Sequence, residues 1–441
     1  MEKIKAAVEK HRNLILDAER YIWKNPETGY KEVKTTEYLK EKFTSLGYTL
    51  TEPEGITGFT ADLDTGRVGP CVMILAELDS IICPEHKDAD KTTGAVHSCG
   101  HNAQCAALVG IAAALKENGV TDALSGKVKL VAVPAEELLE IEYRSTLKEA
   151  GVIKYFGGKS EFLRRGLFDG VDAAFMVHTS SSYCTLRGSV GCIAKNIIYK
   201  GKAAHAGGSP WSGVNALYAA SCGLNAVNAI RETFAEDDII RVHPIMTSGG
   251  SMVNAIPAVA RLESYVRGKS FEAIEKANKK VNRALIGAAL SIGANIEIID
   301  SPGYSPLVND ENMIRLAVDA ANLAIPEENF TVHEGYSSGS TDMGDLSCIM
   351  PVCHPYARGM SGTSHGSDYE IADPDAACVK NAVWQMTMLK LLLENGAARA
   401  KEIISAYKPL FTKEEFLKYQ DSLSSSGDRI TYTEDGASVR L

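Results

Sequence analysis

The sequence lacks the features of membrane, nucleic-acid-binding and disulfide-stabilised proteins. No stretch reaches the roughly eighteen uninterrupted apolar residues of a membrane-spanning helix, and the charged N-terminus has no signal-peptide core. The formal net charge is -10 without any basic run, which disfavours binding to phosphate backbones or anionic membranes. Only 10 of 441 residues are cysteine, far fewer than in a disulfide scaffold. We therefore expect a cytoplasmic protein that has neither nucleic acid nor membrane as a partner.

The sequence also lacks any Cys-x-x-Cys pair, which argues against a structural zinc site and against a thioredoxin-like redox site. The stretch "AVHSCGHNAQC", residues 95–105, nevertheless holds two cysteines and two histidines. Cys99 and His101 are two positions apart, so in an extended segment one metal ion could bind both side chains. Taken alone, the stretch is equally compatible with a packed core that binds no metal.

The chain is too long for one ordinary core, so two or more domains are expected. Apolar runs at 71–80, 126–137 and 171–181 end in acidic or histidine side chains, and a helical pattern at 103–119 separates the first two. Buried parallel strands have this pattern, with polar chemistry at their carboxyl ends. It predicts an α/β fold with an open, mostly parallel sheet flanked by helices.

The pattern changes after residue 188, where half-exposed strands and long helices follow in the order βαββαβ of a ferredoxin-like α+β domain. The α/β pattern returns from residue 305, so this smaller domain is inserted into the larger one. The C-terminal segment is polar and Ser-rich, and we expect it to be loosely attached. The expected divisions are 1–188 and 304–410 for the larger domain, 189–303 for the inserted domain and 411–441 for a C-terminal extension.

Reactive side chains lie at several predicted strand ends. Glu136 and Glu137 follow one strand, where adjacent carboxylates are costly unless a cation or a shared proton compensates. Because neighbours in a strand face opposite ways, one can bind a metal while the other acts as a general base. Glu77 and Asp79 are either ligands or residues that orient a liganding histidine, and His178 alone would be an ordinary core histidine. Together, Cys, His and Glu donors suit zinc or a similar transition metal.

The motifs "AELD", "HSCGHN", "PAEE", "HTSSS", "GKAAHA", "NAIP" and "STDMGD" occur in this order. Over about residues 19–402 the chain resembles the dinuclear metal amidohydrolases of the metallopeptidase/aminoacylase superfamily. That branch includes hydrolases of indoleacetyl-amino acids, hippurate and aminobenzoyl-glutamate. Three of the motifs are most similar to the second of the two aminobenzoyl-glutamate utilisation subunits and to nearby dipeptidases. Asn102 departs from the Asp that most of the wider branch has after the second histidine.

The resemblance implies two divalent metal ions per chain, zinc or manganese before cobalt or nickel. The implied ligands are Cys99, His101, Glu137, His178 and His365. His354 is the rival to His365, and His97 would support a ligand rather than bind metal.

The resemblance also assigns roles around the metals. Glu136 matches the general base that activates a hydroxide between the two ions, and His205 matches a histidine that the inserted lid domain offers to the partner subunit. Asn254 matches a polar residue near the substrate carbonyl or carboxylate, and Arg267 is a candidate to bind a substrate carboxylate. A homodimer formed through the lid is therefore implied.

The implied activity is hydrolysis of the amide bond of a small N-acyl amino acid or dipeptide. A dipeptidase, aminopeptidase or deacetylase of the same superfamily is the alternative within enzymes. A metal-free binding relative would have lost a ligand or the base, whereas every matched position here holds a competent residue.

Overall fold

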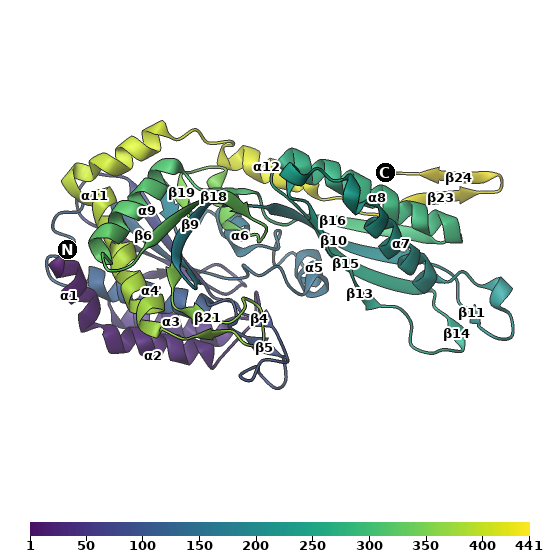
Figure 1. Ribbon diagram of the computed structural model, residues 1–441, viewed down its shortest axis with the longest axis horizontal. Helices are drawn as coiled ribbons and strands as arrows, with labels where there is room; N and C mark the ends of the chain where they lie inside the picture. The colour runs from purple at the N-terminus through teal and green to yellow at the C-terminus, as the bar shows by residue number, and fades with distance from the viewer.

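The larger unit of the protein forms around a sheet whose central strand, β3 (Cys71–Glu77), is buried along its whole length. Because successive strand residues point to opposite faces, Val72 and Ile74 join one hydrophobic cluster, whereas Met73 and Leu75 join another. Helices thus cover both faces, which explains the uninterrupted apolar run. The structure is a computed structural model that describes all 441 residues (Figure 1).

This sheet is mixed, with its parallel strands next to one another. β6, β3, β7 and β19 are mutually parallel, whereas β2 is antiparallel to β6 and β1 is antiparallel to β2. The predicted mostly parallel α/β sheet is therefore present, with an antiparallel edge. In spatial order, the strands are β1 (Leu50–Thr51), β2 (Phe59–Asp64), β6 (Lys127–Val133), β3, β7 (Ala173–Phe175) and β19 (Val352–Cys353).

Helices pack on the two faces of the sheet. The face with the larger cluster, 56 buried residues, is covered by α1 (Glu2–Lys10), α2 (Arg12–Trp23), α3 (Val33–Ser45), α4 (His101–Leu115), α9 (Glu311–Ala324) and α11 (Asn381–Ala406). The other face packs against α6 (Gly158–Arg164), α10 (Met343–Ser347) and α12 (Lys413–Leu423). Every residue of α4 is buried, so its small side chains let it lie in the centre of the unit. None of the helices has the length and apolarity needed to cross a membrane.

A second sheet of the larger unit was not expected from the sequence. Its strands come from distant parts of the chain, and β18 pairs in parallel with β9. The bounds are β8 (His178–Ser180), β9 (Tyr183–Ser189), β17 (Leu307–Val308), β18 (Phe330–Ser337) and β20 (Tyr356–Arg358). Short ladders and one helix complete the loops nearby, namely β4 (Ile81–Ile82) with β5 (Ala95–Val96), β21 (Met360–Ser361) with β22 (Glu370–Ile371), and α5 (Ile141–Glu149).

The smaller unit extends to the right of the larger one in Figure 1 and has its own cluster of 19 buried residues. Its sheet is antiparallel throughout, and the long helices α7 and α8 pack on it. A two-strand ladder of β11 (Ala204–His205) and β14 (Ala255–Ile256) lies at its far tip. The remaining elements in chain order are β10 (Gly191–Lys200), α7 (Ala216–Ile230), β12 (Arg241–Val242), β13 (Ile245–Ser248), β15 (Val259–Gly268), α8 (Phe271–Ile292) and β16 (Asn295–Pro302).

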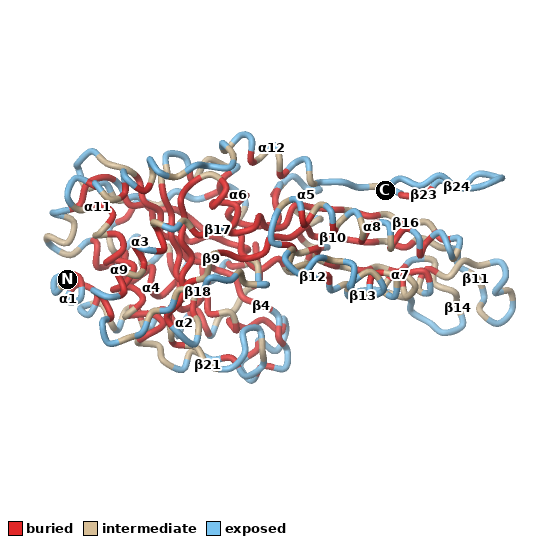
Figure 2. The backbone as a smooth tube through the Cα atoms, turned by 45° about the horizontal axis from the view of Figure 1, so that its top comes forward, coloured by how far each residue is buried: buried red, intermediate tan, exposed pale blue.

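The C-terminal extension connects the two units, so the expectation of a loosely attached tail was wrong for most of it. Phe416 of α12 is fully buried in the larger unit, and Ile430 is buried in the core of the smaller one. Between them, the backbones of Ser425 and Asp300 exchange hydrogen bonds of 2.8 and 3.0 Å along the edge of β16. A few apolar residues at suitable spacing thus anchor a segment whose composition is mostly polar. Residues 421–428 are mostly exposed, and after Ile430 the final hairpin of β23 (Ile430–Thr433) and β24 (Gly436–Val439) is exposed throughout (Figure 2).

We expect Phe416→Ala to lower the free energy of unfolding by about 3–5 kcal/mol, because it removes a buried ring and leaves a cavity. Denaturant unfolding followed by circular dichroism would measure the change. Leu410→Ala, at a position that is 59% exposed just before α12, is the control and should change stability by less than about 0.5 kcal/mol. Equal stability of the Phe416 variant and the wild type would contradict the anchoring role of the extension.

Candidate active site

The Cys-Gly-His segment lies between β5 and α4, where the chain turns sharply. Gly100 has a left-handed backbone with φ of 90°, and a Cβ there would overlap the hydroxyl groups of Thr179 and Tyr369. Glycine therefore lets Cys99 and His101 sit against β8. The segment carries one candidate ligand on each side of the turn.

The other candidate ligands are held by equally constrained backbone. Ala135 and His365 both have left-handed backbones, with φ of 57° and 63°, which is unfavourable for residues with a Cβ. The turn at Ala135 directs Glu136 and Glu137 from the end of β6 into the site. Backbone hydrogen bonds fix these turns, because Glu137 N donates to Asp79 Oδ2 at 2.8 Å and His365 N donates to Ser98 O at 2.8 Å.

The five predicted ligands form two groups that share one thiol. Sγ of Cys99 lies with the ring nitrogens of His101 and His178 in one group, and with Glu137 and His365 in the other. Within each group the ligand atoms are all within 4.8 Å of one another. The structure thus brings all five together, and it includes His365 rather than His354.

The orientation of these side chains fits cations. His101 and His178 donate their Nδ1 protons to backbone carbonyls of Asp79 and Thr179 at 2.8 and 2.9 Å, so Nε2 is the nitrogen that each ring offers to a metal. His178 Nε2 lies 3.4 Å from Cys99 Sγ, the ligand that the two groups share. Glu137 Oε1 and His365 Nε2 are 3.0 Å apart, yet the buried Glu137 Oε1 has no hydrogen-bond partner. His101 Nε2 is also buried and makes no hydrogen bond, although Glu77 Oε2 lies 3.3 Å away. Sulfur, imidazole and carboxylate donors with free lone pairs are the set that zinc-like ions prefer.

The electrostatics of the site also favour bound cations. Burial and the Glu137 carboxylate oppose ionisation of Cys99, but His101 and His178 lower the pKa of its thiol to about 6. The Glu137 carboxylate raises the pKa of His365 to about 11. The chain therefore concentrates thiolate and carboxylate charge that either protons or metal ions must neutralise.

The carboxyl of Glu136 lies in a different environment from that of its neighbour Glu137. It is 6% exposed, and burial, followed by the charges of Glu77 and Glu137, raises its pKa well above the usual range of a carboxyl. Glu136 also lies within 4.8 Å of Glu77 and His101. Glu77, however, is already neutralised by the buried Lys159, whose Nζ lies 2.6 Å from Glu77 Oε1. Glu136 has no such ion pair with a lysine or arginine, so its carboxyl favours the protonated form.

A polar network behind the ligands was not predicted from the sequence. Lys159 of α6 contacts both Glu77 and Asp342, and all three side chains are buried. Gln104 donates to Glu77 Oε2 at 2.9 Å. Asp342 lies in the "STDMGD" motif, which was the only signal for this network, since nothing around Lys159 distinguishes it from a surface lysine.

A cavity of about 540 Å³ opens onto the candidate ligands. Its lining includes Glu136 and Arg267 together with Cys99, Glu137, His178 and His365. Arg267 of β15 reaches the cavity from the smaller unit.

The structure does not bring every predicted residue to this cavity. His205 and Asn254 are exposed at the far tip of the smaller unit and do not line it. His97 is fully buried outside both ligand groups, and burial lowers the pKa of its ring to about 3. His354 lines the cavity but stacks on Tyr356 instead of joining a ligand group.

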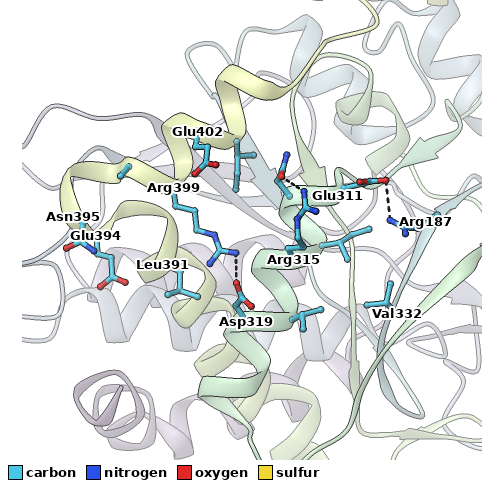
Figure 3. A pocket seen from close by; sticks show the side chains of 15 residues that line it. Arg187, Glu311, Arg315, Asp319, Val332, Leu391, Glu394, Asn395, Arg399 and Glu402 are labelled. Carbon is cyan, nitrogen blue, oxygen red and sulfur yellow. Dashed lines mark hydrogen bonds and ion pairs between the residues drawn. The ribbon is translucent and has the colours of Figure 1, made fainter.

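A second cavity, of about 820 Å³, lies between α9, α11 and β18 (Figure 3). Charged side chains of its lining pair with one another, since Arg399 is 2.7 Å from Asp319 and Arg187 is 3.5 Å from Glu311. It contains no cluster of candidate ligands or nucleophiles, so we assign the chemistry to the first cavity.

Known proteins resemble the chain along most of its length. The Xaa-Arg dipeptidase of Mus musculus is 28% identical over 373 residues, which cover 81% of this chain and 80% of that protein. One of the subunits of the p-aminobenzoyl-glutamate hydrolase of Escherichia coli is 30% identical over 261 residues, 55% of each chain. The crystal structure of a dinuclear metal binding peptidase from Bacillus subtilis superposes with a TM-score of 0.62 at 22% identity, covering 87% of this chain and 99% of that one.

The family relationship follows from a match over most of the chain. The model of peptidase family M20/M25/M40 matches residues 73–390, which include all five candidate ligands and Glu136. The chain is therefore a member of peptidase family M20/M25/M40, a hydrolase of amide or peptide bonds that depends on divalent metal.

Proposed function

We propose that the protein hydrolyses the amide bond of a small N-acyl amino acid or dipeptide at a two-metal centre. The observation that carries this proposal is the pair of ligand groups that share Cys99, beside the free carboxylate of Glu136 in one cavity. Cys99, His101 and His178 would hold one ion, and Cys99, Glu137 and His365 would hold the other. Zinc or manganese suits these donors, with cobalt or nickel as alternatives. When bound, the ions lower the pKa of a water molecule and polarise the amide carbonyl.

Glu136 transfers the proton in the proposed reaction. Glu136 accepts the proton of the attacking water and delivers it to the nitrogen of the leaving amine, as a general base that becomes a general acid. The raised pKa of its carboxyl fits the second half of this role, in which Glu136 holds the proton until the amine takes it, and nearby bound cations would favour the carboxylate that first accepts the proton. Lys159 and Asp342 keep Glu77 fixed behind His101, so the ligand set is preorganised.

Arg267 favours a substrate with a carboxylate. Its guanidinium lines the cavity and makes no ion pair within the chain; it lies 5.4 Å from the centre of the Tyr265 ring, and its one hydrogen bond is a 3.5 Å contact to Ser338 O. A free cation facing the substrate suits the carboxylate of an N-acyl amino acid or of a dipeptide. This supports release of a carboxy-terminal amino acid over an aminopeptidase activity.

The activity is tested with a panel of N-acyl amino acids and dipeptides. Metal-loaded protein should hydrolyse at least one of them, and chelator-treated protein should not, because the attacking water is then no longer activated. Amine release, measured with a colorimetric amine reagent, gives the rate. Failure of the metal-loaded protein on the whole panel would contradict the proposed reaction.

The smaller unit acts, in this proposal, as a ferredoxin-like lid that forms a homodimer. Its tip carries exposed apolar side chains, among them Trp211 at 82% and Val253 at 101% exposure, and β13 is an open sheet edge. Exposed apolar side chains and an unpaired sheet edge in one unit suit contact with a second copy of the chain. His205 and Asn254 lie at the same tip, so a dimer would let them reach the substrate carbonyl in the partner's cavity.

Two inactive variants should restore one another in a mixed dimer. Neither His205→Ala nor Glu136→Gln can form a complete site alone, but a mixed dimer contains one site with both residues. Equal mixing with full subunit exchange should recover about one quarter of the wild-type activity, because half of the dimers are mixed and each has one intact site. Steady-state rates before and after exchange measure this. No recovery despite proven exchange would contradict a role for His205 in the partner's site.

A further inference from the structure

The segment that carries Glu136 and Glu137 has an unfavourable backbone at both of its ends. Ala135 and Glu140, on either side of it, have left-handed backbones with φ of 57° and 51°, which is costly for residues with a Cβ. Such conformations persist only where surrounding contacts hold them. The segment after β6 therefore needs partners outside itself, and those partners determine where the two glutamates lie.

The partners come from the loop between α2 and α3. Glu32 Oε1 accepts a hydrogen bond of 2.8 Å from Ala135 N, 103 positions later in the chain. At the other end of the segment, Glu140 accepts a hydrogen bond of 2.6 Å from Thr28 Oγ1 and forms an ion pair of 2.6 Å with Lys31. This loop thus contacts both of the residues that have left-handed backbones.

The loop fits closely against the turn at Ala135. A Cβ on Gly29 would lie 2.9 Å from Ala135 Cα and would overlap the guanidinium of Arg144, so only glycine allows this approach. Tyr30, the next residue, itself has a left-handed backbone with φ of 62° and packs in the same apolar cluster as Ala135. The loop is therefore shaped by its contact with the turn.

Glu32 is a buried carboxyl that does not line the cavity. It is 0% exposed, and its second oxygen, Oε2, accepts a hydrogen bond of 2.6 Å from Thr57 Oγ1. Burial, followed by the charge of Asp79, raises the pKa of Glu32, so a neutral side chain suits this position. A buried acid is costly, and the one backbone group outside its own loop that it satisfies is Ala135 N.

We propose that Glu32 is a positioning residue, which fixes the turn at Ala135 and thereby holds Glu136 in the cavity. This inference rests on the proposed function, in which Glu136 transfers the proton. Glu137 N has a separate anchor, because it donates to Asp79 Oδ2 at 2.8 Å. Loss of Glu32 would leave Ala135 N buried without an acceptor and release the turn. Misplacing a catalytic group by about 1 Å can lower a rate about 100-fold.

The kinetic test compares metal-loaded Glu32→Leu, Glu32→Asp and Glu32→Gln with the wild type. Leucine removes the acceptor and aspartate withdraws it by one methylene, so both should lower kcat about 10- to 100-fold, while KM changes less than about threefold. Glutamine offers an acceptor to Ala135 N and a donor to Thr57, so it should retain most of kcat. Metal content should equal that of the wild type in all three, because Asp79 still holds Glu137.

Hydrogen exchange of the Ala135 amide gives a readout that does not depend on turnover. The amide should exchange about tenfold faster or more in Glu32→Leu and Glu32→Asp, since the hydrogen bond that protects it is lost. Mass spectrometry with residue-level fragmentation measures this rate. Thr57→Val is the matched control, because it removes the other partner of the Glu32 carboxyl but leaves the acceptor for Ala135 N. It should keep wild-type kcat and slow exchange.

Circular dichroism identifies a variant that does not fold; if Glu32→Leu is one, Glu32→Asp decides. Wild-type kcat and exchange in the folded Leu and Asp variants would overturn the proposal. A loss of kcat in Glu32→Gln as large as in Glu32→Asp would overturn it too, because the acceptor would then not be what matters. Fast exchange in Glu32→Asp, in a protein whose wild type cleaves no substrate, would support the anchor and place the failure in the proposed reaction.

Discussion

Glu136→Gln is expected to lower kcat by about 10²- to 10⁴-fold, the usual contribution of a general acid–base residue. Glutamine keeps the size and hydrogen-bonding shape of the side chain but cannot accept the proton of the attacking water. Because Glu136 belongs to neither of the two ligand groups that share Cys99, the variant should keep both metal ions. Steady-state kinetics and metal analysis of the purified protein measure the two effects together.

Measuring turnover and metal content together distinguishes a general base from a metal ligand, because only the loss of a ligand should also remove metal. Glu137→Gln should lose activity and metal together, since Glu137 is one of three ligands in its group. Glu142→Gln, at an exposed position of α5, is the control and should retain both. Near-normal kcat in Glu136→Gln would reject it as the base, and loss of metal would mean that it binds an ion.

Much of the site was predictable because its residues lie at the ends of strands or next to them. Glu136 and Glu137 follow β6, and His178 follows β7 at the start of β8. Parallel strands bring their carboxyl ends to one edge, so polar residues after apolar runs meet there. Cys99 and His101 needed the motif as well, because β5 is too short for the sequence pattern to identify.

Other parts of the site depend on contacts between residues that are far apart in the chain, which a local sequence pattern does not predict. Ser189 and Ser340 line the same cavity only because β9 pairs with β18, more than a hundred residues later in the chain. Lys159 is typical of an exposed helix in composition, and only the fold encloses it between Glu77 and Asp342. The anchoring of the C-terminal extension was missed for the same reason, since Phe416 and Ile430 are among only a few apolar residues in a mostly polar segment.

Cys99→Ala is expected to remove most of both metal ions, a larger loss than any other single ligand substitution should cause. The thiol is the one side chain common to both groups, so its removal leaves two ligands in each. His178→Ala or His365→Ala should each retain about one ion, because one complete group of three ligands survives. Mass spectrometry of metal content after dialysis against buffered zinc would give the stoichiometries.

Cys105→Ala is the matched control for the loss of a thiol. Cys105 is buried in α4 only a few residues away, but its Sγ contacts Glu77 O at 3.0 Å and belongs to neither ligand group. It should keep both ions and most of the activity, whereas Cys99→Ala should lose both. Retention of two ions in Cys99→Ala would show that the thiol is not a ligand, and the sites would then be independent. Loss of both ions in Cys99→Ala, against one in His365→Ala, requires a shared thiolate, since separate sites could not lose both through one residue.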